Sequence, residues 1–245
     1  MNNKLYILLV LTLLICSCKQ RIPVLYLIGD STMADKPDKT YPERGWGQLL
    51  PTFIDSTLNI SNHAKNGRST RSFIYEARWD SVVKLLQPGD FVVIQFGHND
   101  GVESKTGRHA TLVEYEYNLT KFIADTRAKK CAPILCTPIA RRNFVNGVQT
   151  DTHGVYPDIV RKVATKTNAP LIDMHKTSMR LLTQLGEQES LALFLHIPPE
   201  KFEKYPDGKI DNTHLSEKGA IEIAKLFIDE VKTKKLTLAN HFKNE

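Results

Sequence analysis

Residues 91–96, Phe-Val-Val-Ile-Gln-Phe, are the stretch that decides the fold. Their apolarity is nearly continuous and does not alternate, which indicates a strand covered on both faces, as in a parallel sheet. Other apolar runs of strand length lie on either side, separated by longer segments in which apolar residues recur at helical spacing. The predicted strands are 24–28, 58–64, 91–96, 132–136 and 170–173, and the predicted helices are 46–53, 79–86, 111–130, 156–167, 174–184 and 215–232. This alternation predicts a three-layer α/β/α domain with a doubly wound, five-stranded parallel sheet.

The composition is ordinary for a folded protein of 245 residues. Hydrophobic residues make up 41% and charged residues 24%, which excludes disordered and fibrous classes. The only long apolar run is at the N-terminus, which also excludes an integral membrane protein. The formal net charge is +6, but the positive residues are scattered and no recognition motif accompanies them, so we expect no nucleic-acid partner.

The N-terminal segment has the pattern of a secretory signal. Lys4 precedes the apolar residues 5–15, and small residues follow at 16–18. Residues 14–18 resemble a bacterial lipobox, in which the last cysteine, here Cys18, is lipidated and becomes the mature N-terminus. An ordinary cleaved signal and an uncleaved anchor are the alternatives.

These features predict a lipoprotein signal over residues 1–17, a short tether over 18–23 and one domain over 24–245. We expect export across the inner membrane and anchoring to a membrane through the lipid. Residues 19–21 supply no acidic run of the kind that resembles surface-export signals, which favours the periplasmic face over the cell surface.

Two cysteines remain outside the predicted signal, Cys131 and Cys136. Five steps along a strand cover about 16 Å, whereas a disulfide tolerates about 4.4–6.8 Å between Cα atoms. We therefore expect two unpaired, buried cysteines.

Polar residues follow the first three predicted strands, and ligands of such sheets bind where strands end. Ser31 could expose its hydroxyl and offer its backbone N–H to a developing anion, or it could cap a helix. Gly67 could present its N–H without a side chain in the way, or form a plain turn. Asn99 could donate from its amide. His98 and Asp100 are a weak metal signal, and we expect no metal there.

Asp211 and His214 lie close to the predicted last helix. An Asp three residues before a His can accept the Nδ1 proton of the imidazole and leave Nε2 as a base. The alternative is a surface pair that caps the helix.

Four sequence blocks together carry a family resemblance. They are residues 28–33, 62–73, 95–100 and 211–219, with a further similar segment at 137–142. They resemble the SGNH (GDSL-like) hydrolase superfamily and, within it, the rhamnogalacturonan acetylesterases. The resemblance implies a flavodoxin-like fold and a serine esterase that needs no metal or organic cofactor. The implied substrate is an acetylated plant cell-wall polysaccharide, in the first place rhamnogalacturonan; another SGNH esterase (acetylxylan esterase, aryl-esterase, lipase or thioesterase) and a non-catalytic glycan-binding lipoprotein are the alternatives.

The resemblance also implies a role for each matching residue. Ser31 would attack the ester carbonyl, His214 would take the serine proton, and Asp211 would orient the imidazole. The backbone N–H groups of Ser31 and Gly67 and the amide of Asn99 would hold the oxyanion. The order Ser, Asp, His, with only two residues between the last two, disfavours the Gly-x-Ser-x-Gly type of hydrolase.

Four arginines lie within or beside these blocks: Arg68, Arg71, Arg141 and Arg142. Arginine binds carboxylates through two parallel hydrogen bonds, so these residues are candidates to bind the galacturonates of rhamnogalacturonan. The alternative is that they pair with Asp or Glu inside the domain.

Overall fold

The computed structural model of the protein describes residues 21–243. Its main sheet has the strand order β2-β1-β3-β4-β7, and each neighbouring pair is parallel. The five strands are β1 Val24–Gly29, β2 Asn59–Asn62, β3 Phe91–Gln95, β4 Ala132–Cys136 and β7 Leu171–Ile172. Each corresponds to one of the predicted strands. The doubly wound, flavodoxin-like fold is therefore confirmed.

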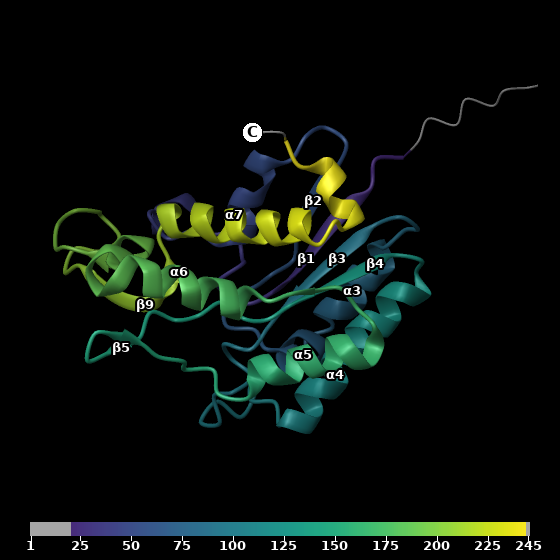
Figure 1. Ribbon diagram of the computed structural model, residues 1–245, viewed down its shortest axis with the longest axis horizontal. Helices are drawn as coiled ribbons and strands as arrows, with labels where there is room; N and C mark the ends of the chain where they lie inside the picture. Colours follow the sequence, from purple (N-terminus) through teal and green to yellow (C-terminus); the bar gives the residue numbers. More distant parts are fainter. Residues whose placement is uncertain (1–20, 244–245) are drawn as a thin grey trace, which may run out of the picture.

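Helices cover both faces of the sheet. The α-helices are α1 Trp46–Leu49, α2 Thr70–Tyr75, α3 Arg78–Leu85, α4 Leu112–Ala128, α5 Tyr156–Thr167, α6 Met174–Glu189 and α7 Glu217–Thr233. The short 3₁₀ helices are η1 Asp38–Thr40, η2 Leu50–Phe53, η3 Ser190–Leu193 and η4 Thr237–His241. Figure 1 shows α6 and α7 on one face and α3, α4 and α5 on the other.

The central strands β1 and β3 are largely apolar on both sides because each side meets its own helical layer. Along β1, Leu25 and Leu27 belong to the core shared with α1 and α7. The intervening Tyr26 and Ile28 belong to the core shared with the helices on the opposite face. This alternation follows from the two-residue period of a strand and explains the continuous apolar run of β3.

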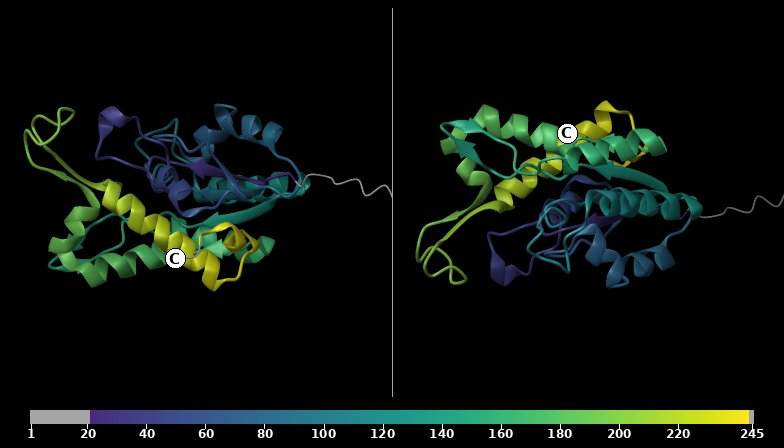
Figure 2. Two further views of the ribbon diagram at one scale, coloured as in Figure 1. Left: turned by 90° about the horizontal axis from the view of Figure 1, so that it is seen from above. Right: turned by 90° about the horizontal axis from the view of Figure 1, so that it is seen from below.

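Two short antiparallel hairpins were not predicted from the sequence. They are β5 Phe144–Val145 with β6 Val148–Gln149, and β8 Phe194–Ile197 with β9 Lys209–Leu215. β9 is largely polar and half-exposed, so it carries no apolar run that would mark it as a strand. The loop between β8 and β9 projects from the body of the molecule in both views of Figure 2.

The helices differ from the predicted ones at several points, among them α6, which extends to Glu189 rather than ending at 184. The predicted helix 46–53 is divided into α1 and η2, with Pro51 in the second part. The last helix begins at Glu217 rather than 215, because Ser216 is its N-cap and accepts the N–H of Gly219. Helix α2 was not predicted from the sequence; it is short and begins at a capping box between Ser69 and Ser72.

The predicted signal over residues 1–17 and Cys18 lie outside the described residues. Arg21, within the predicted tether, makes two hydrogen bonds of 2.7 and 3.0 Å from its guanidinium to Asp90 of the domain. Within residues 21–243, no helix combines the length and the apolarity that crossing a membrane requires. Cys131 and Cys136 are both free and buried, as predicted.

Candidate active site

A cavity of about 670 Å³ lies at the carboxyl ends of β1 and β3. The strand order reverses between these two neighbours, since β2 lies on one side of β1 and β3 on the other. Ligands of open α/β sheets bind at such a reversal. Ser31 follows β1 and Asn99 follows β3, and both line the cavity.

A tight turn after β1 positions Ser31. The carbonyl oxygen of Asp30 accepts the N–H groups of Met33 and Ala34. The buried Asp30 carboxylate accepts both the N–H and the hydroxyl of Thr32, at 2.9 and 2.8 Å. No helix of the described chain begins at Ser31, and the next helical segment is η1, so the helix-cap interpretation of this serine is wrong.

His214 lies between Ser31 and Asp211. Its Nε2 is 3.0 Å from the Ser31 Oγ, and its Nδ1 is 2.8 Å from the Asp211 Oδ2. The other carboxylate oxygen of Asp211 accepts the backbone N–H groups of Thr213 and His214. The alternative in which the Asp–His pair caps the last helix is wrong, because Ser216 does so.

The surroundings of Asp211 keep its carboxylate ionised. Burial alone would raise the pKa of Asp211, but hydrogen bonds from the His214 ring and from two backbone N–H groups outweigh it. They hold the pKa of Asp211 well below its usual range. An ionised Asp211 keeps the His214 proton on Nδ1, which leaves the Nε2 lone pair free to take a proton from Ser31.

Three N–H donors face the same cavity. Gly67 has φ +74°, a backbone conformation that favours glycine, and the Arg108 guanidinium lies beside it. The Asn99 amide donates one hydrogen to the carbonyl of Arg68 at 2.9 Å and has a second hydrogen for a ligand. Within residues 21–243, neither the Ser31 N–H nor the Gly67 N–H has a backbone acceptor.

His98 and Asp100 do not share a site. The His98 Nδ1 is 3.2 Å from the buried Asp30 carboxylate and so connects the segments that follow β3 and β1. The Asp100 carboxylate accepts the N–H and the hydroxyl of Thr70, at 2.9 and 2.6 Å, where α2 begins. The two side chains therefore serve different parts of the structure.

Of the two adjacent arginines after β4, one reaches the cavity. Arg141 lines it and donates to the carbonyl of His98 at 3.0 Å. Arg142 is buried and donates to the Ser190 hydroxyl and to the carbonyl of Glu187, so it supports the fold and is not a substrate contact.

The arginines at 68 and 71 are paired inside the domain. Arg68 bonds Glu76 at 2.9 Å and contributes only its carbonyl beside the cavity, through Asn99. Arg71 makes two hydrogen bonds of 3.0 and 2.8 Å to Glu114, on a surface away from the cavity. The expectation that Arg71 contacts substrate is therefore wrong.

The cavity contains basic residues that sequence reasoning missed. Besides Arg141, the cationic lining residues are Lys105, Arg108, Lys204 and Lys209, against the acidic Glu43 and Asp211. Among the described residues, the Arg108 guanidinium has no hydrogen-bond or ion-pair partner. Lys105 and Arg108 lie in the loop after β3, Lys204 in the loop between β8 and β9, and Lys209 is the first residue of β9. All four are outside the recognised blocks, so no motif signalled them. The cavity carries five positive and two negative groups and is suited to an anionic ligand.

A serine hydroxyl, an imidazole and a carboxylate in hydrogen-bonded series, beside unpaired N–H donors, are the components that serine hydrolases use. On this flavodoxin-like sheet they define a class of α/β ester hydrolases. The chain belongs to the GDSL-like lipase/acylhydrolase family, whose sequence profile matches residues 27–220. It is therefore a carboxylic ester hydrolase of this family.

Three relatives show the range of the similarity. The rhamnogalacturonan acetylesterase RhgT of Bacillus subtilis (strain 168) is 38% identical over 217 residues, which cover 88% of this chain and 92% of that protein. The probable rhamnogalacturonan acetylesterase YesY of the same organism is 32% identical and covers 85% and 92%. The crystal structure of protein YxiM from Bacillus subtilis superimposes with a TM-score of 0.76 at 25% identity, over 89% of this chain and 58% of that chain.

Proposed function

We propose that the protein removes acetyl groups from rhamnogalacturonan, with Ser31, His214 and Asp211 as its catalytic triad. The observation that carries the proposal is the series of hydrogen bonds from the Ser31 Oγ through His214 to Asp211, in a cavity with excess positive charge. The similarity to the rhamnogalacturonan acetylesterase RhgT supports this substrate.

The reaction has two stages, and His214 moves the proton in both. In the first, the Ser31 Oγ attacks the acetyl carbonyl while its proton passes to the His214 Nε2. The N–H groups of Ser31 and Gly67 and the Asn99 amide stabilise the oxyanion, and His214 protonates the departing sugar oxygen, which leaves as a hydroxyl. In the second, water attacks the acetyl-serine, gives its proton to His214, and acetate leaves as the Ser31 hydroxyl is restored.

The walls of the cavity favour an acidic polysaccharide. Galacturonate carries a carboxylate, and a guanidinium can bind it with two charge-assisted hydrogen bonds. Arg108 is available for such binding because it has no partner among residues 21–243. Arg141 lines the same cavity and retains hydrogen bonds to Thr152 that hold it in position.

Acetate release from two polymers tests the substrate class. We expect kcat/KM on acetylated rhamnogalacturonan to exceed that on neutral acetylated xylan, and the difference to shrink as salt is raised to about 0.5 M, because salt screens exposed charges. Equal kcat/KM on the two polymers at low ionic strength would reject the pectin assignment and leave a general carbohydrate acetylesterase.

The variant Arg108→Gln tests whether the cationic residues that line the cavity bind the acidic polymer. We expect the ratio of kcat/KM on acetylated rhamnogalacturonan to kcat/KM on acetylated xylan to fall by about tenfold. A fall of this size corresponds to the loss of one hydrogen-bonded carboxylate contact worth roughly 1.5 kcal/mol. Arg71→Gln is the matched control, because it removes the same charge outside the cavity and should leave the ratio unchanged. A ratio that falls equally in both variants would indicate a general charge effect and not a binding site.

The variant Asn99→Ala tests the oxyanion assignment. Deleting one oxyanion donor lowers kcat by about 10²–10³ in serine hydrolases, and we expect the same range here. KM should change less, because this contact strengthens only as charge develops on the oxygen. Steady-state kinetics on a chromogenic acetate provide the measurement. A kcat within twofold of the wild type would make Asn99 a structural residue.

We propose, in addition, that Cys18 is lipidated and holds the enzyme at the periplasmic face of a membrane. A cysteine with several acyl chains anchors stably, whereas one chain binds only marginally. The mass of the native N-terminal peptide decides this point, since an unmodified N-terminus after Cys18 would contradict it.

A further inference from the structure

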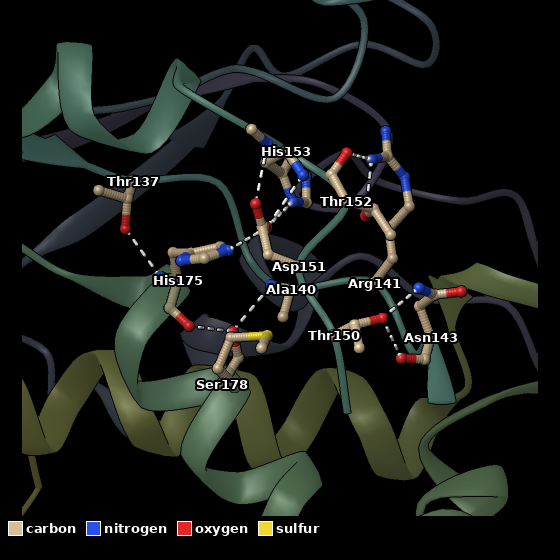
Figure 3. A network of polar contacts seen from close by, with 12 residues as sticks. Thr137, Ala140, Arg141, Asn143, Thr150, Asp151, Thr152, His153, His175 and Ser178 are labelled. Carbon is tan, nitrogen blue, oxygen red and sulfur yellow. Dashed lines mark hydrogen bonds and ion pairs between the residues drawn. The ribbon is translucent and has the colours of Figure 1, made fainter. Parts of the chain in front are cut away.

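A second cluster of chemically active side chains lies beyond His98. Asp151 and His153 precede α5, and His175 is in the first turn of α6. Figure 3 shows the Asp151 carboxylate between the two imidazole rings. Its Oδ1 is 2.7 Å from the His175 Nε2 and 3.7 Å from the His153 Nδ1. One ligand atom from each of the three residues can be chosen so that all lie within 4.8 Å of one another.

His153 is the unusual member of this cluster. Its side chain is 1% exposed, and both of its ring nitrogens are buried without a hydrogen-bond partner among residues 21–243. Buried polar groups nearly always have partners, so an orphaned imidazole calls for an explanation. Its nearest aromatic neighbours, His98 and His175, pack against it edge to face and accept no hydrogen bond from it.

We propose that Asp151, His153 and His175 bind a divalent transition-metal ion of the Zn²⁺ type. Two imidazole nitrogens with one carboxylate oxygen are a common zinc ligand set. Bonds of about 2.0–2.2 Å in a tetrahedral arrangement place ligand atoms about 3.4 Å apart. The 2.7 and 3.7 Å separations straddle this value, so modest side-chain shifts would suffice. Metal binding would displace the proton that the His175 Nε2 shares with Asp151.

The surroundings already hold the ligands in place. The Asp151 carboxylate accepts the backbone N–H of His153 at 2.9 Å and that of Gly154 at 2.8 Å, which fixes its orientation. Burial holds the pKa of His153 well below its usual range, so the ring is neutral and has a lone pair to offer. A cavity of about 250 Å³ borders His153 and Gly154 and has room for a water ligand that completes the coordination.

The ligand atoms and the nearby positive charge together determine which kind of metal ion the site would bind. The guanidinium of Arg141 bonds Thr152 beside the cluster and opposes any cation. A single carboxylate is too few oxygen ligands for Ca²⁺ or Mg²⁺, whereas direct nitrogen coordination suits Zn²⁺, Co²⁺ and Ni²⁺. The bound ion would link the segment before α5 to α6, next to Arg141, which lines the active-site cavity. This inference does not depend on the proposed esterase mechanism.

Calorimetric titration of the chelator-treated protein with ZnCl₂ tests the site. We expect one Zn²⁺ per chain, and no saturable binding of CaCl₂. His153→Gln and His175→Gln should each weaken zinc binding by more than about 100-fold, since even outer-shell partners contribute about 10–100-fold. The matched control is His241→Gln, which removes a distant histidine bonded to Thr57 and should leave the affinity unchanged.

Two further measurements keep the test decisive. Asp151→Asn is nearly isosteric, so it reports on the site if a histidine variant does not fold, and it should also weaken zinc binding by at least tenfold. The Co²⁺-loaded protein should show ligand-field absorption without thiolate charge-transfer bands. Zinc binding that is equally tight in wild type and in the His153, His175 and Asp151 variants, or thiolate bands, would overturn the proposal.

Discussion

Ser31→Ala should abolish ester hydrolysis, with kcat lowered by at least about 10⁴. Among residues 21–243, the Ser31 Oγ is the only group of the cavity that is both hydrogen-bonded to the His214 Nε2 and placed beside the N–H donors of Gly67 and Asn99. Its removal leaves no nucleophile, so only the residual effect of the oxyanion donors on attack by water remains. Burst and steady-state kinetics on a chromogenic acetate provide the measurement.

The fold should survive this substitution. The Ser31 hydroxyl bonds only His214 among the described residues, whereas Asp30 and Thr32 make the bonds that build the turn. We therefore expect Tm within about 2 °C of the wild type. A chelator should not affect turnover of a small acetate by the wild type, because no step passes through a metal. Undiminished turnover by the alanine variant would contradict the serine mechanism, and so would a loss of turnover with EDTA that persists in the His153→Gln variant, which lacks the proposed zinc site.

The fold could be predicted from the sequence because its signals are local. The apolar run of β3 reports burial on both faces, and β1 and β4 are marked in the same way, whereas the more polar edge strand β2 is not. A parallel sheet then brings the residues after β1, β2 and β3 to one edge, whatever the details of the loops. Ser31, Gly67 and Asn99 therefore line one cavity, as the sequence led us to expect.

The contacts of the arginines could not be predicted, because their partners are distant in sequence. Arg71 meets Glu114 from α4, and Arg142 meets the carbonyl of Glu187 from α6. Nothing in the blocks that contain these arginines encodes those neighbours. Arg108 was missed for the converse reason, since it comes from a loop without a recognised motif and is brought to the cavity only by the fold.

The sequence also did not predict the hairpin of β8 and β9. β9 carries Asp211 and His214, but its polar residues gave no sign of a strand. Likewise, His153 and His175 are far apart in the chain, in a loop and in a helix. Their spacing matches no metal motif, and only the packing of α6 against the segment before α5 brings them together.

Asp211→Asn should lower kcat by about 10⁴ while leaving the site assembled, because an amide permits the wrong imidazole tautomer. An asparagine can donate to the His214 Nδ1, which would place the imidazole proton on Nε2 and leave no base for Ser31. The matched control is Asp207→Asn, an exposed residue of the same hairpin that does not line the cavity. It removes the same charge and should leave kcat unchanged.

The pH dependence of stability distinguishes the charge of Asp211 from its shape. The folded protein holds the pKa of Asp211 well below its usual range, so the unfolded chain binds the proton more readily. The stabilisation is therefore fully present above the unfolded pKa of about 3.9 and is lost as the pH falls through the lower folded value. The Tm advantage of the wild type over Asp211→Asn should be constant near neutrality and narrow below about pH 4. A constant difference across that range, or a variant kcat within tenfold of the wild type, would show that the carboxylate does not act on His214 by its charge.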